Sequence, residues 1–77
     1  SMMGMLIKNQ ITIKNITDNM RMTYSIVPES EANLKEMKIS VSSPIGRGLL
    51  GKKVGDIAEI QVPNGIINFE IEKISAV

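Results

Sequence analysis

Several residue types that commonly carry chemistry are absent or scarce in this 77-residue sequence. It has no cysteine, which excludes disulfides and cysteine-ligated metals, and no histidine, the commonest general base and zinc ligand. Tryptophan is absent, and the chain has 1 tyrosine and 1 phenylalanine, too few for a surface on which nucleic-acid bases stack. Any catalysis would therefore fall to aspartate, glutamate, lysine, serine or tyrosine.

Strong net charge and long hydrophobic runs are also absent. The chain carries 9 basic and 8 acidic residues, a formal net charge of +1 at pH 7. A protein that binds nucleic acid without sequence preference usually has a clear basic excess, which disfavours that class here. No apolar run approaches the roughly 18 residues of a membrane-spanning helix, so we expect no membrane contact.

The first residues do not have the pattern of a signal peptide. The stretch SMMGML is too short and too uncharged. Ser1 stands before Met2, as after cleavage of an expression tag, which would make the chain a piece of a longer protein. We therefore expect residues 1–9 to be a tag remnant or linker and residues 10–77 to form one small domain.

Apolar and polar residues alternate through most of the chain, the pattern of half-buried β-strands. Residues 10–27 alternate on both sides of the turn-forming run at 17–19 and predict a hairpin. Residues 37–42 predict a third strand. The polar stretch 28–36 is interpreted as a solvated loop, with one helical turn over residues 29–33 as the alternative.

The last third of the sequence gives the clearest hairpin. Residues 58–62 and 67–72 alternate, and Pro63, Asn64 and Gly65 lie between them. Asn-Gly between alternating runs favours a type I′ turn, in which both central residues have positive φ. Because proline has no N–H to donate to a β-ladder, we place Pro63 at a strand end or a sheet edge.

The segment SSPIGRGLLGKK, residues 42–53, contains two motifs with the spacing of nucleotide-binding loops. Residues 46–51 spell G-x-G-x-x-G, and residues 46–52 spell G-x-x-x-x-G-K. The first motif belongs to parallel sheets with crossover helices, for which this hairpin-rich chain is too short. The second needs serine or threonine after the lysine, where Lys53 stands. We therefore reject a nucleotide site.

The same segment is better interpreted as a short helix with a signal at each end. Ser43 is a favourable N-cap, and Pro44 suits the first helical position. Gly51 suits the position after the helix, where positive φ is needed. The hydrophobic residues that would pack onto the sheet are Ile45, Leu49 and, as an alternative, Leu50.

Gly46 and Gly48 lie inside the predicted helix, where each costs roughly 1 kcal/mol relative to alanine. Capping does not explain them, so we interpret them as space for the close approach of a neighbouring backbone or of another protein. Arg47 projects from the same helix, as either a solvated surface charge or an interface contact. We interpret Lys52 and Lys53 as solubilising charges or as charges that complement the dipole at the helix C-terminus, rather than as ligands of anything.

Four stretches together resemble the C-terminal domain of the bacterial Gre transcript-cleavage factors. They are YSIV at 24–27, KISVSSPIGR at 38–47, LLGKKVGD at 49–56 and VPNG at 62–65. The resemblance covers most of the chain, from residue 10 to residue 74. It implies an FKBP-like α+β fold, a twisted antiparallel sheet of about five strands with one short helix near residues 43–51 packed against it.

The resemblance also implies what such a domain does. Gre factors rescue backtracked RNA polymerase: an N-terminal coiled coil enters the secondary channel, and acidic residues at its tip help hold a catalytic Mg²⁺. The C-terminal domain docks on a coiled coil of the polymerase β′ subunit at the channel rim. Because this sequence has no heptad pattern, the resemblance implies the RNA polymerase-binding domain of a transcription elongation factor without the effector coiled coil.

Further implications concern location and site. The resemblance implies a cytoplasmic domain that is not an enzyme, has no cofactor, metal or small-molecule substrate, and meets DNA and RNA only through the transcription complex. By the same resemblance, Glu29 and Glu31 are additional interface residues. The main docking residues are Ser42, Ser43, Pro44, Ile45 and Arg47.

Two alternatives remain open. Peptidyl-prolyl isomerases also have an FKBP-like fold, but that chemistry needs an aromatic-lined apolar pocket, and we assign Tyr24 and Phe69 to the core. The second alternative is a stand-alone protein that only binds and regulates RNA polymerase. A metal site at Glu29 and Glu31 is disfavoured, because two carboxylates on a polar loop have no further ligands in register.

Overall fold

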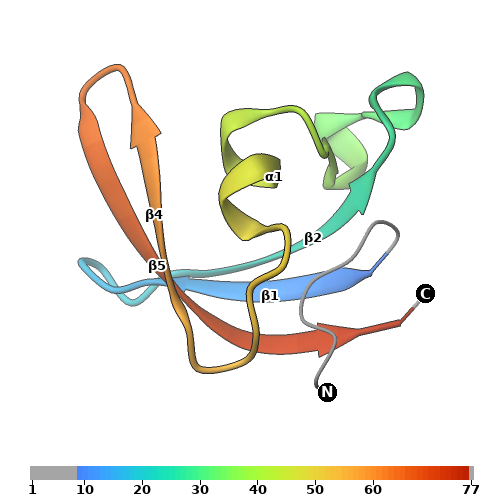
Figure 1. The fold of residues 1–77 in the computed structure, drawn as a ribbon. Helices are drawn as coiled ribbons and strands as arrows, with labels where there is room; N and C mark the ends of the chain where they lie inside the picture. Colours follow the sequence, from blue (N-terminus) through green and yellow to red (C-terminus); the bar gives the residue numbers. More distant parts are fainter. Residues whose placement is uncertain (1–8, 77) are drawn as a thin grey trace.

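The computed structural model describes residues 9–76, in which a curled sheet of five strands wraps around a short helix (Figure 1). The strand order is β3-β2-β1-β5-β4. The predicted α+β class, with five strands and one short helix, is confirmed. Most of the predicted tag remnant or linker, residues 1–9, lies outside the described residues. The elements are β1 (Gln10–Asn15), β2 (Arg21–Val27), η1 (Glu29–Glu31), η2 (Leu34–Glu36), β3 (Lys38–Ser40), α1 (Pro44–Leu49), β4 (Ile57–Val62) and β5 (Gly65–Ser75).

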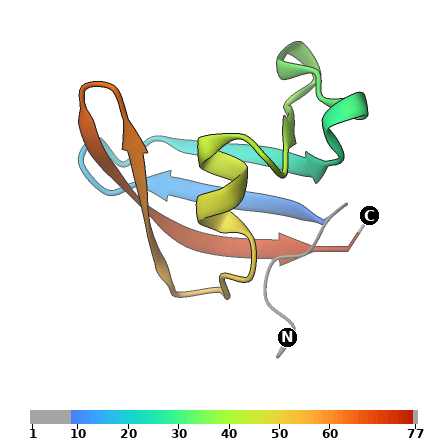
Figure 2. The same cartoon turned by 45° about the horizontal axis from the view of Figure 1, so that its top comes forward.

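The sheet is mixed, so the prediction of a wholly antiparallel sheet is wrong at one pairing. β1 pairs antiparallel with β2 and with β5, and β4 with β5, but β3 runs parallel to β2. The cause is the connection from β2 to β3. It consists of two short 3-10 turns, η1 and η2, and the residues of both are exposed to solvent. η1 is the helical turn that was the alternative for residues 29–33, and η2 was not predicted. Together they carry the chain back to the start of β3, beside β2 (Figure 2).

The first predicted hairpin is confirmed, with β1 and β2 joined by a turn over residues 16–20. Its geometry is set by short polar side chains: the Asn15 Oδ1 accepts from the Thr17 N–H at 2.9 Å, and the Asp18 Oδ1 accepts from the Met20 N–H at 2.8 Å. Asn19 takes a left-handed φ of 62°. These are the side-chain turns that favour asparagine and aspartate at such positions.

The second hairpin is confirmed, but its predicted turn type is wrong. Val62 pairs with Gly65, so the two central residues are Pro63 and Asn64 rather than Asn64 and Gly65. The pyrrolidine ring fixes a negative φ at Pro63, and Asn64 does not take a positive φ either. Gly65 opens β5 with a φ of 133°. Pro63 follows the edge strand β4, as predicted.

The core lies between the concave face of the sheet and α1. Tyr24 and Phe69 are 8% and 3% exposed, which confirms their assignment to the core. α1 contributes Leu49, which is fully buried, while Ile45 packs partly against the same cluster. The cluster consists of Ile11, Ile13, Tyr24, Ile26, Ile39, Leu49, Ala58, Ile60, Phe69 and Ile71.

A β-bulge in β5 keeps its hydrophobic residues on the core side. The pairing with β1 shifts between Thr12 and Ile13, so Thr12 opposes Lys73 whereas Ile13 opposes Ile71. Glu72 is the additional residue. Ile71 and Ile74 therefore both face the core although they are three positions apart, which strict alternation does not permit.

Both helix glycines are explained by the protein's own packing. A Cβ on Gly46 would collide with the carbonyl oxygen of Ser40, and a Cβ on Gly48 would collide with the end of the Ile60 side chain. Of the two explanations for these glycines, the close approach of a neighbouring backbone applies to Gly46. Gly48 has a third explanation that was not predicted, because it makes room for a side chain of the same domain. α1 sits nearer to the sheet than an alanine helix permits.

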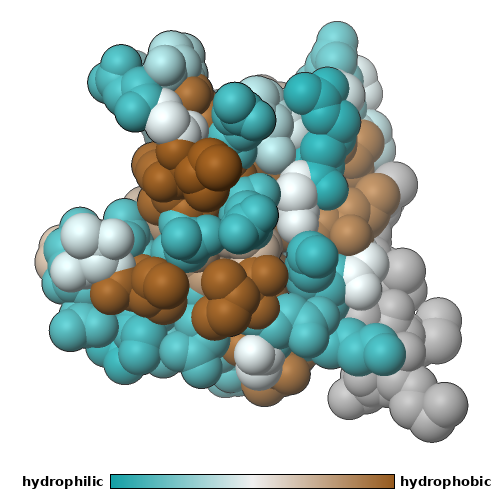
Figure 3. All heavy atoms as spheres, turned by 60° about the vertical axis from the view of Figure 1, so that its left-hand side comes forward, coloured by the Kyte–Doolittle hydropathy of each residue, from teal (hydrophilic) through white to brown (hydrophobic). Residues whose placement is uncertain are grey.

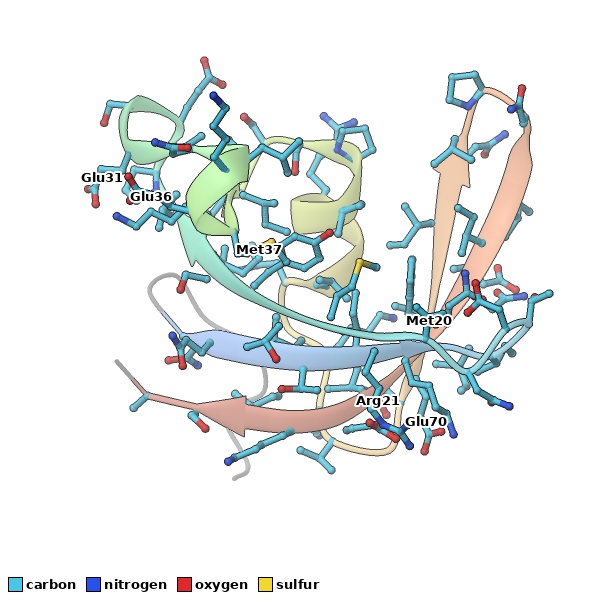
Figure 4. The ribbon with its side chains drawn as sticks, turned by 180° about the vertical axis from the view of Figure 1, so that it is seen from behind. Met20, Arg21, Glu31, Glu36, Met37 and Glu70 are labelled. Carbon is cyan, nitrogen blue, oxygen red and sulfur yellow. The ribbon has the colours of Figure 1, made fainter. Side chains whose placement is uncertain are left out.

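The outer face of the sheet carries an ion-pair network across three strands. Arg21 on β2 donates to Glu72 on β5 from Nε at 2.6 Å and from Nη2 at 3.2 Å. Lys14 on β1 lies 3.4 Å from Glu70 and 3.9 Å from Glu72, and Figure 4 shows Arg21 and Glu70 at the same end of the sheet. The hydrogen bond from Arg21 lowers the pKa of Glu72, and the same bond raises the pKa of Arg21. No helix within residues 9–76 is long and apolar enough to cross a membrane.

We expect Gly46→Ala to destabilise the domain more than Gly48→Ala. Overpacking against a fixed backbone carbonyl should cost about 2 kcal/mol or more, at the upper end of such effects. The Ile60 side chain can rotate away from a methyl at Gly48, and alanine gains roughly 1 kcal/mol of helix propensity, so that change should stay near zero. Urea unfolding of both variants measures the difference, and equal losses would contradict this account.

Glu72→Gln should lower the free energy of unfolding at pH 7 but have little effect in strong acid. Because the pKa of Glu72 is lowered from 4.5 in the folded chain, its stabilisation is complete above that value and is lost as the pH falls through the folded-state pKa. The pair is solvent-exposed, so the effect should also weaken with salt. Glu31→Gln is the control, and a loss that persists in strong acid would refute the assignment.

Candidate functional site

The corner between β3 and α1, residues 40–47, is fixed by hydrogen bonds at the start of the helix. The Ser43 Oγ accepts from the Gly46 N–H at 3.0 Å and donates to the Ser40 carbonyl at 2.7 Å. Ser43 is thus the N-cap, and Pro44 occupies the first helical turn, as predicted. Gly51 takes a φ of 83° just beyond the helix, also as predicted. Leu50 is 44% exposed, so it is not part of the packed face.

A chain of hydroxyl groups links the corner to η1. The Ser42 Oγ donates to the Glu29 Oε1 at 2.7 Å, and the Ser40 Oγ lies 2.7 Å from the Ser42 Oγ. Because Ser42 has one hydroxyl hydrogen and an ionised carboxylate only accepts, Ser40 is the donor to Ser42. The Ser40 Oγ in turn accepts from the Ser42 N–H at 3.0 Å. All three hydroxyl groups of residues 40, 42 and 43 are therefore hydrogen-bonded.

The structure brings most of the predicted site residues together, but some of them are exposed and others are partly buried in structural roles. Ser42, Pro44 and Arg47 are exposed and available to a partner. Ser43 and Ile45 are half-buried, the first as helix cap and the second against the core. Glu29 reaches the corner through Ser42.

Glu31 does not reach the corner. It lies at the outer end of the β2–β3 connection, exposed to solvent (Figure 4). No hydrogen bond or ion pair of its side chain is present among residues 9–76. In that part of the chain no group of three or more acidic side chains is arranged to hold a metal ion.

Sequence reasoning missed Ser40 and an open groove beside α1. Ser40 is buried at 9% exposure and connects Ser42 to Ser43. The signal was a run of three serines in four residues before Pro44, since serine hydroxyls commonly satisfy backbone groups at turns. The groove has a volume of about 500 Å³. Its lining residues are Arg47, Gly48, Leu50, Lys52, Ile57 and Glu59.

Arg47 is the charged residue of the corner, and the exposed hydrophobic residues do not form one continuous surface around it. The ion pairs among residues 9–76 lie on the outer sheet face and between Lys38 and Glu36, so none neutralises Arg47. On the face shown in Figure 3, hydrophobic residues form separate patches with hydrophilic ones between them. A partner would therefore meet local features rather than one broad apolar face.

Comparison with known proteins identifies the family. Residues 5–76 match the family described as "Transcription elongation factor, GreA/GreB, C-term". The chain is 58% identical over 69 residues to the transcription elongation factor GreA of Christiangramia forsetii and 59% identical over 70 residues to that of Flavobacterium psychrophilum. These matches cover 90% and 91% of this chain and 44% of each relative. The chain thus spans less than half the length of the curated relatives it matches.

The solved structures give the same result. The GreA factor homolog 1 (Gfh1) of Thermus thermophilus superposes with a TM-score of 0.81 at 29% sequence identity, covering 99% of this chain and 49% of that protein. Gfh1 of Thermus aquaticus superposes with a TM-score of 0.82 at 30% identity, covering 95% and 50%. With the matched family spanning nearly the whole chain, this protein belongs to the GreA/GreB transcription elongation factor family and corresponds to its C-terminal domain.

Proposed function

We propose that this domain binds RNA polymerase at the rim of the secondary channel, on the β′ coiled coil, through residues 42–47 of the corner. Family membership supports the choice of partner. The observation that carries the choice of site is the fixed corner, where Ser42, Pro44 and Arg47 are exposed while hydrogen bonds below them hold the backbone.

The physical properties of these residues suit a binding surface. The φ of proline is fixed before binding, and arginine is enriched among the residues that contribute most to interface affinity. Because Ser43 and Ser40 already fix the local geometry, little conformational entropy is lost when a partner binds. The corner is thus pre-organised for a protein partner.

We propose stimulation of transcript cleavage only for a protein in which this domain is joined to a coiled coil, as the resemblance implies for Gre factors. The chain matches 44% of the GreA sequences, and the coiled coil implied by the resemblance lies outside the match. This domain would then supply attachment, in the cytoplasm, and would meet nucleic acid only through the transcription complex.

We also propose that the domain is not itself an enzyme. Tyr24 and Phe69, its two aromatic residues, are buried in the core, and the groove beside α1 is lined by aliphatic and charged side chains. An isomerase site needs an aromatic-lined apolar pocket for the proline ring. Turnover of a prolyl peptide at the uncatalysed rate is the expected assay result, and acceleration by the domain would restore the isomerase alternative.

The double variant Pro44→Ala, Arg47→Ala should bind a β′ coiled-coil fragment at least about tenfold more weakly, since truncating a hot-spot residue of an interface costs about 2 kcal/mol or more. Isothermal titration calorimetry measures the affinity, and urea unfolding confirms that the variant is folded. Lys73→Ala, an exposed change on the outer sheet face, is the control. Unchanged affinity of the double variant would show that the site is elsewhere.

Glu29 and Ser42 should act as a pair. Loss of their hydrogen bond by Glu29→Ala or Ser42→Ala should weaken binding by about two- to tenfold, the range expected for one such bond. The double variant should bind no more weakly than either single variant, because both changes remove the same bond. Glu29→Gln retains an acceptor for the Ser42 hydroxyl and should bind like the wild type. A large loss in Glu29→Gln would instead show that the carboxylate charge contacts the partner.

A further inference from the structure

The groove beside α1 uses residues that neither the core nor the corner requires. Leu50 and Ile57 are large hydrophobic residues that remain 44% and 48% exposed at its walls. Lys52 and Glu59 also line the groove. Arg47 lines the groove and also belongs to the corner, so the two surfaces are continuous. A partner that contacts Arg47 at the corner therefore also reaches one wall of the groove.

The way α1 meets β4 decides what can enter the groove. β4 is an edge strand, so half of its backbone groups have no neighbouring strand. At Glu59, however, the carbonyl oxygen lies 3.8 Å from the place where Gly48 would carry a Cβ, so α1 covers the edge there. An added β-strand would collide with the helix. The groove accepts side chains rather than an extended backbone.

The lining specifies the chemistry of those side chains. Leu50 and Ile57 offer an apolar contact for an aliphatic side chain. Arg47 and Lys52 outnumber Glu59, and neither cation belongs to the ion pairs formed among residues 9–76. A carboxylate is therefore the complementary charged group. The volume of about 500 Å³ exceeds what a single small group would fill.

We infer that the groove receives an aliphatic side chain and a neighbouring carboxylate from RNA polymerase, as a second contact beside the corner. The inference rests on the proposed function, because the partner seated on the corner is the one that reaches the groove. It adds a specificity element: the corner supplies a rigid point of attachment, and the groove selects one apolar and one acidic side chain at a fixed distance from it.

Matched pairs of variants test the groove. Ile57→Lys places a charge against the apolar wall and should weaken binding to core RNA polymerase at least about tenfold. Ile66→Lys is its control, because Ile66 is an exposed isoleucine of the same hairpin, at 58%, outside the lining. The polymerase of Flavobacterium psychrophilum is a suitable partner, since its GreA is 59% identical to this chain over 70 residues.

The second pair changes charge alone. Lys52→Glu reverses a cation in the lining, whereas Lys53→Glu makes the same change one residue away, outside it. Long-range steering would affect both variants equally. We expect Lys52→Glu to weaken binding by at least about fivefold relative to Lys53→Glu, as for a direct charge contact across an interface. This pair keeps the inference testable if Ile57→Lys does not fold.

The outcomes separate this inference from the proposed function. Weakening by Ile57→Lys and Lys52→Glu, with both controls near the wild type, supports the groove contact. If the corner variant weakens binding and neither groove variant differs from its control, the groove inference is wrong and the proposed function stands. If the wild-type domain does not bind the polymerase, both fail.

Discussion

The close approach of α1 to the sheet is the constraint on which the rest of the structure depends. A helix of six residues is not stable in isolation, because it forms too few hydrogen bonds to offset the free energy of nucleation. α1 forms because Leu49 enters the core and because Gly46 lets its axis approach the Ser40 carbonyl. Gly48 leaves room for the end of the Ile60 side chain. The same approach positions Arg47 on the surface and leaves the groove beside β4.

The connectivity of the sheet explains why this one helix matters so much. β3 and β4 are the two edge strands, and α1 is the segment that joins the side of β3 to the side of β4 (Figure 1). In crossing the concave face, it covers the core and protects the β4 edge at Glu59. The surface proposed to bind the partner is therefore the outer side of the element that closes the fold.

Features encoded by neighbouring residues could be predicted from the sequence. The two hairpins, the Ser43 cap, the Gly51 stop and the burial of Tyr24 and Phe69 all follow from local pattern. The direction of β3 could not, because it depends on the path of the η1–η2 crossover through space. The Pro63–Asn64 turn was missed because Asn-Gly is the stronger local signal although the register excludes it. The contacts of Ser40 and the lining of the groove each join residues from separate elements, and the periodicity of a sequence does not reveal such contacts.

The two hydrogen bonds of Ser43 have a consequence for the lifetime of the domain. Since one of them joins the helix start to the backbone of β3, the proposed docking surface exists only while sheet and helix are both folded. A partner that recognises this surface is then a ligand of the native state alone, and at a concentration of 100 times its dissociation constant it would add about 2.7 kcal/mol to stability. For so small a domain that is a large fraction of the total. Binding to the partner would thus protect the domain from proteolysis as well as hold it at its site of action.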